Sequence, residues 1–185
     1  MKKPAIFFDR DGIIVKPVNG EAPVSPELLE LIPEIIPVLK KVKEKGYLVF
    51  VASNQPDLAI GLIEEKTKNQ LEERFVSLLK KQSVNVDKIY YCHHDKNSTN
   101  PEYSFDCDCR KPKAGLIFQA MKEFEVDIEK SFMVGDRASD IKAGKSAGVK
   151  TVLYDPGNLQ NEYLKEHQVI PDFEIGELSG ILQII

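Results

Sequence analysis

Three carboxylates, a serine and a lysine stand where hydrophobic runs end or helical patterns begin. Asp9 and Asp11 follow the first apolar run in "AIFFDRDG", Ser53 ends a second run, and Asp136 ends a later one in "MVGDR". Lys113 opens a helical pattern, where its charge opposes the helix dipole unless an anion lies nearby. Ligands of an open α/β sheet sit outside the carboxyl ends of its strands, so we expect these five side chains to converge there.

Such a set can transfer a phosphoryl group. Carboxylates crowded into one pocket repel each other unless a hard cation lies among them, and Mg²⁺ takes oxygen ligands while keeping waters for a substrate phosphate. One carboxylate beside Mg²⁺ can attack phosphorus to form an aspartyl-phosphate, and a second, two residues on, can protonate the leaving oxygen and then activate water. A hydroxyl and a lysine can hold the phosphoryl oxygens. Each motif alone reads as a turn or a helix cap, so the prediction depends on their joint occurrence.

A second cluster holds every cysteine of the chain. The pairs Cys92-x-His94 and Cys107-x-Cys109, with His93 as an alternative to His94, give three thiolates and one imidazole. That is a composition of structural zinc sites, and it leaves no open position for catalysis. The polar loop between the pairs lacks a core of its own, so a metal would fold it. The alternative is three buried free cysteines and a chance histidine.

The elements that must position these residues follow from the hydrophobic pattern. Short apolar runs that predict buried strands cover 5–9, 47–53, 88–92, 131–136 and 149–155. Helical patterns cover 34–45, 64–82, 113–125 and 138–147, with one more helix expected near 158–166 and a last strand or helix at 173–185. We therefore predict an α/β fold in a single domain of residues 1–185, with a doubly wound, Rossmann-like, mostly parallel sheet.

Composition limits the partners. The chain of 185 residues is 42% hydrophobic and 29% charged with a net charge of −4, which argues against a non-specific nucleic-acid surface. The first apolar run stops at Asp9, too soon for a signal peptide, and no run approaches a membrane span. Three cysteines do not make a disulfide framework. We expect a cytoplasmic monomer that binds a small phosphorylated metabolite, with no nucleic-acid and no membrane partner.

The segments "FFDRDGII", "ASNQ", "CRKPKAG" and "MVGDRASDIKAG" resemble the four motifs of the haloacid dehalogenase (HAD) superfamily. The resemblance implies a HAD-like fold in which Asp9 is the nucleophile and Asp11 the general acid and base. It implies that Ser53 and Lys113 bind phosphoryl oxygens. It also implies Mg²⁺ on Asp9, on the backbone carbonyl of Asp11 and on Asp136.

The pattern C-x-H…C-x-C-R-K-P resembles one subgroup of that superfamily. The subgroup contains the D-glycero-D-manno-heptose bisphosphate phosphatases and the phosphatase domain of the bifunctional histidine-synthesis enzyme, and the spacing between the ligand pairs is closer to the heptose enzymes. This resemblance picks His94 as the zinc ligand. It implies that a zinc loop, residues 92–109, stands in place of a large cap domain and aims Arg110 and Lys111 at the pocket.

Two segments depart from the heptose pattern. Where that group reads S/T-N-Q-S-G-I-A-R-G, this chain reads "SNQPDLAIG", with Pro56 and Asp57 in place of Ser-Gly and Ile60 in place of arginine. The segment "PVNGEAPVS", residues 17–25, differs as well. Both segments lie where the rest of the substrate should sit, so the prediction of phosphoryl transfer stands on more residues than that of the substrate.

We therefore expect a Mg²⁺-dependent phosphomonoester hydrolase with a structural Zn²⁺, acting on a small phosphorylated sugar, first of all D-glycero-D-manno-heptose 1,7-bisphosphate. Asn54 and Arg137 are expected to contact substrate. Histidinol phosphate is an alternative substrate. Alternatives of another class are a phosphate-accepting signalling receiver and a zinc-stapled module that binds nucleic-acid ends. Asp140 either supports the metal ligands from behind or is a carboxylate on a helix surface.

Overall fold

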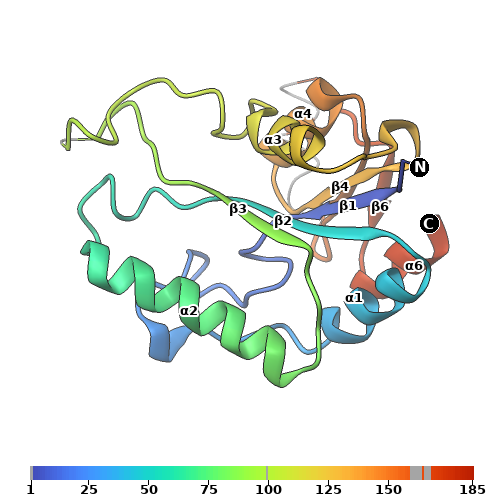
Figure 1. Ribbon diagram of the computed structural model, residues 1–185, viewed down its shortest axis with the longest axis horizontal. Helices are drawn as coiled ribbons and strands as arrows, with labels where there is room; N and C mark the ends of the chain where they lie inside the picture. Colours follow the sequence, from blue (N-terminus) through green and yellow to red (C-terminus); the bar gives the residue numbers. More distant parts are fainter. Residues whose placement is uncertain (1, 99, 159–163, 165–167) are drawn as a thin grey trace.

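A six-stranded sheet, parallel throughout, forms the centre of the protein (Figure 1). The computed structural model describes residues 2–98, 100–158, 164 and 168–185. The strands are β1 (Ala5–Phe8), β2 (Leu48–Asn54), β3 (Lys88–Cys92), β4 (Phe132–Gly135), β5 (Lys150–Tyr154) and β6 (Phe173–Ile175). They lie in the order β3-β2-β1-β4-β5-β6. The predicted α/β class with a doubly wound parallel sheet is confirmed.

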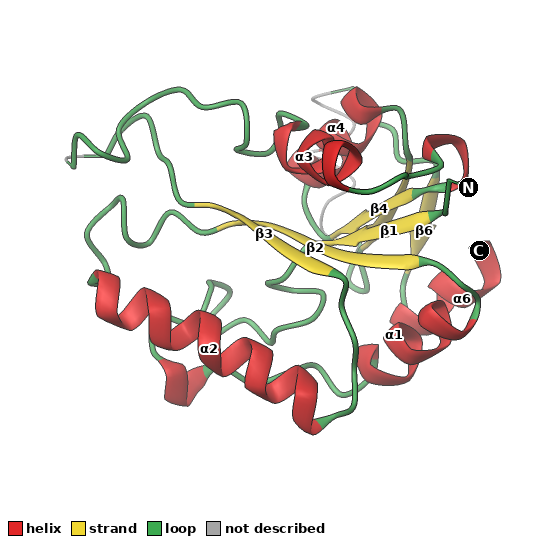
Figure 2. Cartoon of the chain, viewed as in Figure 1, coloured by secondary structure: helices red, strands yellow, loops and turns green. Residues whose placement is uncertain are grey.

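Helices cover both faces of this sheet (Figure 2). They are α1 (Ile35–Glu44), α2 (Glu65–Lys81), α3 (Gly115–Glu123), α4 (Ala138–Ala147) and α6 (Ile181–Ile184), with 3₁₀ turns at Pro26–Leu28, Ile128–Lys130 and Leu178–Gly180. Helices α1, α2 and α6 lie on one face, and α3 and α4 on the other. Successive strand residues point to opposite faces, so Ile6 and Phe8 belong to one buried cluster and Ala5 and Phe7 to the other. Burial on both faces explains why the strands are continuous apolar runs.

Two differences from the predicted elements matter below. Helix α3 begins at Gly115, not at Lys113. The segment 173–185 contains both a strand, β6, and a short helix, α6. The helix expected near 158–166 lies largely outside the described residues. Within the described ranges, no helix has the length and apolar character that a membrane crossing requires.

The loops that leave the carboxyl ends of the strands are the long ones. Residues 9–34 join β1 to α1, 55–64 join β2 to α2, and 93–114 join β3 to α3. Strand β1 has β2 on one side and β4 on the other. The connections from β1 and from β4 therefore diverge to opposite sides, which opens a crevice at this edge of the sheet.

Candidate active site

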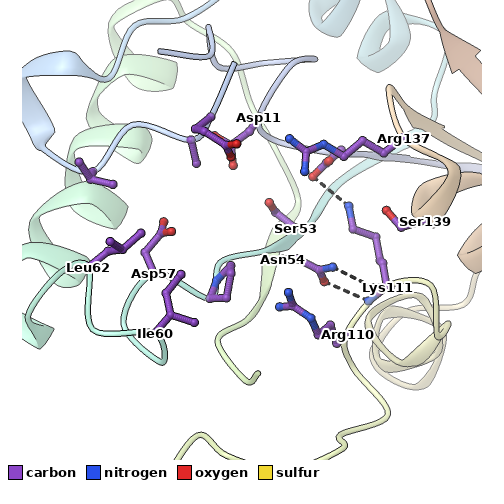
Figure 3. A pocket seen from close by; sticks show the side chains of 15 residues that line it. Asp11, Ser53, Asn54, Asp57, Ile60, Leu62, Arg110, Lys111, Arg137 and Ser139 are labelled. Atoms are coloured by element: carbon purple, nitrogen blue, oxygen red, sulfur yellow. Dashed lines mark hydrogen bonds and ion pairs between the residues drawn. The ribbon is translucent and has the colours of Figure 1, made fainter. Parts of the chain in front are cut away.

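A cleft of about 410 Å³ occupies this crevice. Segments that follow β1, β2 and β4 line it, together with residues from the loop before α3 (Figure 3). The residues predicted from the sequence that line it are Asp9, Asp11, Ser53, Asn54, Arg110, Lys111 and Arg137. The fold thus brings together side chains that are far apart in the chain.

Three carboxylates meet on the β1–β4 side of the cleft. Asp9, Asp136 and Asp140 each offer one oxygen, and these atoms lie within 4.8 Å of one another. The Oδ1 atom of Asp136 is buried and has no hydrogen-bond partner among the described residues. Burial, and then repulsion from Asp140 and Asp9, raises the pKa of Asp136 to about 7. A buried, unpartnered carboxylate oxygen beside two further carboxylates fits a hard divalent cation such as Mg²⁺.

Gly12 leaves the space for this arrangement. Its φ is +86°, and a Cβ atom at this position would overlap the Asp136 carboxylate. The turn after β1 can therefore approach the end of β4 only with glycine here.

Lys111 neutralises part of the charge. Its Nζ atom lies 2.9 Å from Asp9 Oδ1 and 2.5 Å from Asp140 Oδ1, and its side chain is only 3% exposed. Burial alone would lower the pKa of Lys111, but the carboxylates of Asp140 and Asp9 outweigh burial and raise it. The lysine is therefore a fixed cation in a desolvated part of the cleft.

Asp140 belongs to the floor of the site and is not on the helix surface. It is fully buried in the first turn of α4. Its Oδ2 atom accepts a hydrogen bond from the backbone N–H of Arg137 at 3.1 Å, while Oδ1 faces Lys111. Both oxygens are thus engaged, which favours support of Lys111 over direct ligation of a metal.

Lys113, the lysine that the sequence pointed to, lies outside the cleft. Its side chain is 41% exposed and pairs with Asp106 at 2.8 Å. The argument from the helix dipole was wrong here, because α3 starts two residues later and Lys113 is not in its first turn.

The Asn54 side chain fixes the backbone of Lys111 by two hydrogen bonds, 3.0 Å and 2.9 Å long, and so directs Lys111 inward. Among the two lysines of "RKPK", it is Lys111 that occupies the position expected of Lys113.

Asp11 is held by residues that the sequence reasoning missed. Its carboxylate accepts hydrogen bonds from Arg10 Nε at 3.1 Å and Nη2 at 3.0 Å, and from Gln55 Nε2 at 2.5 Å. Arg10 is 1% exposed. Burial raises the pKa of Asp11, although the attraction of Arg10 opposes the rise. A carboxyl group with a raised pKa suits an acid that gives up a proton and takes it back.

Ser53 and Arg137 complete the cleft. The Ser53 hydroxyl, at the end of β2, accepts a hydrogen bond from Gln55 Nε2 at 3.0 Å and is almost fully buried. Arg137 precedes α4, and its guanidinium group points into the cleft near Lys111 (Figure 3). Arg10 and Gln55 lie within the motifs quoted from the sequence. The sequence alone gave no reason to assign either of them a role, because each one only neighbours the residues with an expected role.

The cysteine cluster lies next to the cleft. The Sγ atoms of Cys92, Cys107 and Cys109 lie 3.1 to 3.5 Å apart, and His94 Nδ1 lies 3.2 Å from Cys109 Sγ. A tetrahedral Zn²⁺ with bonds of about 2.3 Å to sulfur would set these edges near 3.8 Å, so small outward movements would accommodate it. A hydrogen bond from the Cys109 thiol lowers the pKa of Cys92, which favours a thiolate there. The donor set fits zinc.

His93 and Arg110 flank this cluster without belonging to it. His93 lies 3.1 Å from the backbone oxygen of Gln55 and 3.2 Å from a carboxylate oxygen of Glu72. Arg110 donates a hydrogen bond to the backbone oxygen of His94 and pairs with Asp95 at 3.1 Å. The loop that carries the cysteines is thereby tied to the turn after β2 and to the edge of the cleft.

Sequence comparisons identify relatives along most of the chain. The model of the HAD-hydrolase-like family matches residues 108–179. The D-glycero-beta-D-manno-heptose-1,7-bisphosphate 7-phosphatase of Pasteurella multocida is 41% identical over 84% of this chain and 83% of its own length. The D-glycero-alpha-D-manno-heptose-1,7-bisphosphate 7-phosphatase of Campylobacter jejuni is 33% identical over 94% of this chain and 92% of its own length.

Solved structures agree with this result. A HAD-like phosphatase from Mesorhizobium loti has a TM-score of 0.77 and 31% identity, covering 83% of this chain and 73% of its own. The D,D-heptose 1,7-bisphosphate phosphatase of B. bronchiseptica, solved with magnesium and phosphate, has a TM-score of 0.79 at 24% identity over the full length of both chains. The latter likeness concerns the fold.

These comparisons favour an enzyme over the two alternatives of another class, the signalling receiver and the nucleic-acid binding module. The chain belongs to the HAD superfamily of phosphatases, in which it groups with the heptose-bisphosphate phosphatases.

Proposed function

We propose that the chain hydrolyses a phosphorylated heptose through an aspartyl-phosphate on Asp9, with the help of Mg²⁺. The observation that carries this proposal is the buried Lys111 ammonium between Asp9 and Asp140, beside the unpartnered oxygen of Asp136. The nucleophilic carboxylate of Asp9, an ammonium group that can hold phosphoryl oxygens, and a carboxylate that could bind a metal ion lie here side by side.

Asp9, Asp136 and the backbone carbonyl of Asp11 would hold Mg²⁺. When bound, the ion neutralises charge on the substrate phosphate and lines that group up with the nucleophile. Asp140 remains free to fix Lys111, since both of its oxygens are engaged as described above.

Asp9 is oriented for attack by two contacts at one oxygen. Its Oδ1 atom accepts a hydrogen bond from the backbone N–H of Arg10 at 2.7 Å and lies 2.9 Å from Lys111 Nζ. An Asp9 oxygen forms a bond to phosphorus as the bond from phosphorus to the leaving oxygen breaks. Lys111 and the Ser53 hydroxyl stabilise the phosphoryl oxygens, and Asp11 gives its proton to the leaving oxygen.

The second half-reaction reverses the role of Asp11. Its carboxylate takes a proton from a water molecule whose oxygen attacks phosphorus. The bond between phosphorus and Asp9 breaks, which releases inorganic phosphate and restores both aspartates. Arg10 and Gln55 keep the Asp11 carboxylate at one place through both steps.

The substrate class comes from the relatives. The Pasteurella and Campylobacter enzymes are named for the 7-phosphate of heptose 1,7-bisphosphate, and we infer the same kind of ester here. A zinc ion at Cys92, His94, Cys107 and Cys109 would close the loop that delivers Arg110 and Lys111.

Phosphate release from heptose 1,7-bisphosphate and from histidinol phosphate, with Mg²⁺ and with a chelator, tests the proposal. We expect Mg²⁺-dependent release with the heptose ester preferred. Lys111→Met should lower the rate by about 100-fold or more, since a cation at the phosphoryl group is lost. Lys113→Met is the matched control and should leave the rate unchanged. Equal losses in the two variants, or release without Mg²⁺, would contradict the assignment.

The raised pKa of Asp136 predicts how metal-free protein responds to pH. Its folded pKa of about 7 exceeds the ordinary 3.8, so ionised Asp136 destabilises the fold above about pH 7, and stability returns as the pH falls below that value. Mg²⁺ should therefore raise the melting temperature more at about pH 8 than at about pH 6, because protons and metal compete for the same oxygens. Asp136→Asn should abolish this difference. A magnesium effect that is the same at both pH values in the wild type would be the contrary result.

The zinc proposal predicts metal content. Cys107→Ser should lose bound zinc and expose residues 93–114 to protease, because the loop has little apolar contact to hold it otherwise. His93→Gln should keep its zinc, since His93 lies outside the cluster. Metal analysis of the purified variants gives the answer, and undiminished zinc in Cys107→Ser would refute the four-ligand site.

A further inference from the structure

Asp11, the acid and base of the proposed reaction, has a layer of polar side chains behind it. The layer consists of Arg10 and Gln55, Glu72 from α2, Tyr91 from β3, and His93 from the start of the loop that follows β3. All of them except Tyr91 line a cavity of only about 10 Å³, which has room for at most one water molecule. The orientation of each polar group in this layer therefore depends on its neighbours.

Gln55 links the layer to Asp11. Its side-chain amide donates a hydrogen bond to Asp11 Oδ2 at 2.5 Å. The Gln55 N–H donates to the backbone oxygen of Cys92 at 2.7 Å, and the Gln55 carbonyl oxygen lies 3.1 Å from His93 Nδ1. Because a carbonyl oxygen can only accept, Nδ1 carries the hydrogen of this bond. Two consecutive residues at the end of β3 thus hold the N–H and the carbonyl of Gln55, and with them the base of its side chain.

Glu72 in turn holds the His93 ring. The Glu72 Oε1 atom is buried and accepts no well-aligned hydrogen bond from the described residues, but it lies 3.2 Å from His93 Nε2. Contact with His93 lowers the pKa of Glu72, although burial acts in the opposite direction. One ring nitrogen therefore lies against the turn after β2 and the other against α2, which fixes the orientation of the ring.

Tyr91 closes the layer on the side of Arg10. The centre of the Arg10 guanidinium group lies 5.9 Å from the centroid of the Tyr91 ring, and the centroids of the Tyr91 and His93 rings are 5.7 Å apart. A cation over an aromatic face is attracted to it. The two groups that bind Asp11, the Arg10 guanidinium and the Gln55 amide, thus both rest on residues at the end of β3.

His93 is a neighbour of the cysteine cluster in the chain without belonging to it. The loop of residues 93–114 therefore serves the cleft from both of its ends. Near its end, Lys111 lies against Asp9. At its start, His93 contacts Gln55, which binds Asp11.

We propose that His93, oriented by Glu72, is a positioning residue for the acid and base. It fixes the backbone of Gln55, and through the Gln55 amide it sets the orientation of the Asp11 carboxylate. This inference rests on the proposed function, since it concerns the residue that gives a proton to the leaving oxygen and takes one from water.

Replacement of His93 by leucine tests this role. His93→Leu removes both ring nitrogens, so the Gln55 carbonyl loses its partner and Asp11 is held less firmly. We expect kcat for heptose 1,7-bisphosphate to fall by about 10-fold or more while KM stays within about twofold, because a positioned acid and base contributes about 10²- to 10⁴-fold. His93→Asn, whose side-chain amide can donate in place of Nδ1, should recover most of that rate.

A second ester separates a displaced Asp11 from a displaced loop. In p-nitrophenyl phosphate an Asp9 oxygen bonds to phosphorus as p-nitrophenolate leaves, and this leaving group needs no proton. In His93→Leu this ester should keep its rate, or release p-nitrophenol in a burst of about one equivalent of protein if attack by water has become the slow step. Displacement of Lys111 would slow phosphorylation by both esters and give no burst. Zinc content should equal that of wild type.

Helix α2 supplies a matched pair of variants. Glu72→Gln keeps the shape of the side chain but removes the charge that faces His93, so kcat for the heptose ester should fall in the same direction as in His93→Leu, by a smaller factor. Glu73→Gln removes the same charge from the next residue, which is exposed, and should leave kcat unchanged.

The inference is overturned if His93→Leu turns over the heptose ester at the wild-type rate, or if both esters slow by one factor without a burst. It is also overturned if His93→Asn is as impaired as His93→Leu. Failure of the proposed function looks different, because wild-type protein would then release no phosphate from the heptose ester in the presence of Mg²⁺.

Discussion

The site depends on one buried ion pair network, the Lys111 ammonium between the carboxylates of Asp9 and Asp140. Three carboxylates crowd the ends of β1 and β4, and burial, followed by repulsion from Asp140 and Asp9, raises the pKa of Asp136. One fixed cation offsets part of that charge. Removing one partner of a buried pair typically costs about 3–5 kcal/mol. The remaining negative charge, with the unpartnered oxygen of Asp136, fits a divalent cation.

The position of Lys111 is set through its backbone, by contacts from the end of β2 and from within its own loop. The side chain of Asn54, the last residue of β2, accepts a hydrogen bond from the N–H of Lys111 and donates one to its carbonyl oxygen. The cysteine cluster and the pairing of Arg110 with Asp95 hold the preceding residues of the same loop. Since a compact loop of polar residues has little hydrophobic energy of its own, these few contacts decide where Lys111 points. The cysteine cluster thus helps to set the position of Lys111 from outside the cleft.

Much of this could be predicted from the sequence, because hydrophobic periodicity sets the strands and helices, and strand ends carry Asp9, Asp11, Ser53 and Asp136. The choice between Lys111 and Lys113 could not be predicted, since it depends on where α3 begins. That helix begins at Gly115, two residues later than the sequence pattern predicts. Nor could the burial of Asp140, which requires close approach of α4 to β4 across Gly135. Arg10 reads as a turn residue, and only tertiary contacts show that it clamps Asp11.

The nucleophile assignment is the central claim, and the most direct measurement compares phosphate release by wild type and Asp9→Asn at saturating Mg²⁺. The asparagine keeps the shape of the side chain but cannot form an acyl phosphate. The account predicts a fall in rate by about 10³-fold or more, with the fold retained and substrate still bound. Turnover by Asp9→Asn near the wild-type rate would contradict it, and phosphoryl transfer would then have to proceed without a covalent intermediate on this residue.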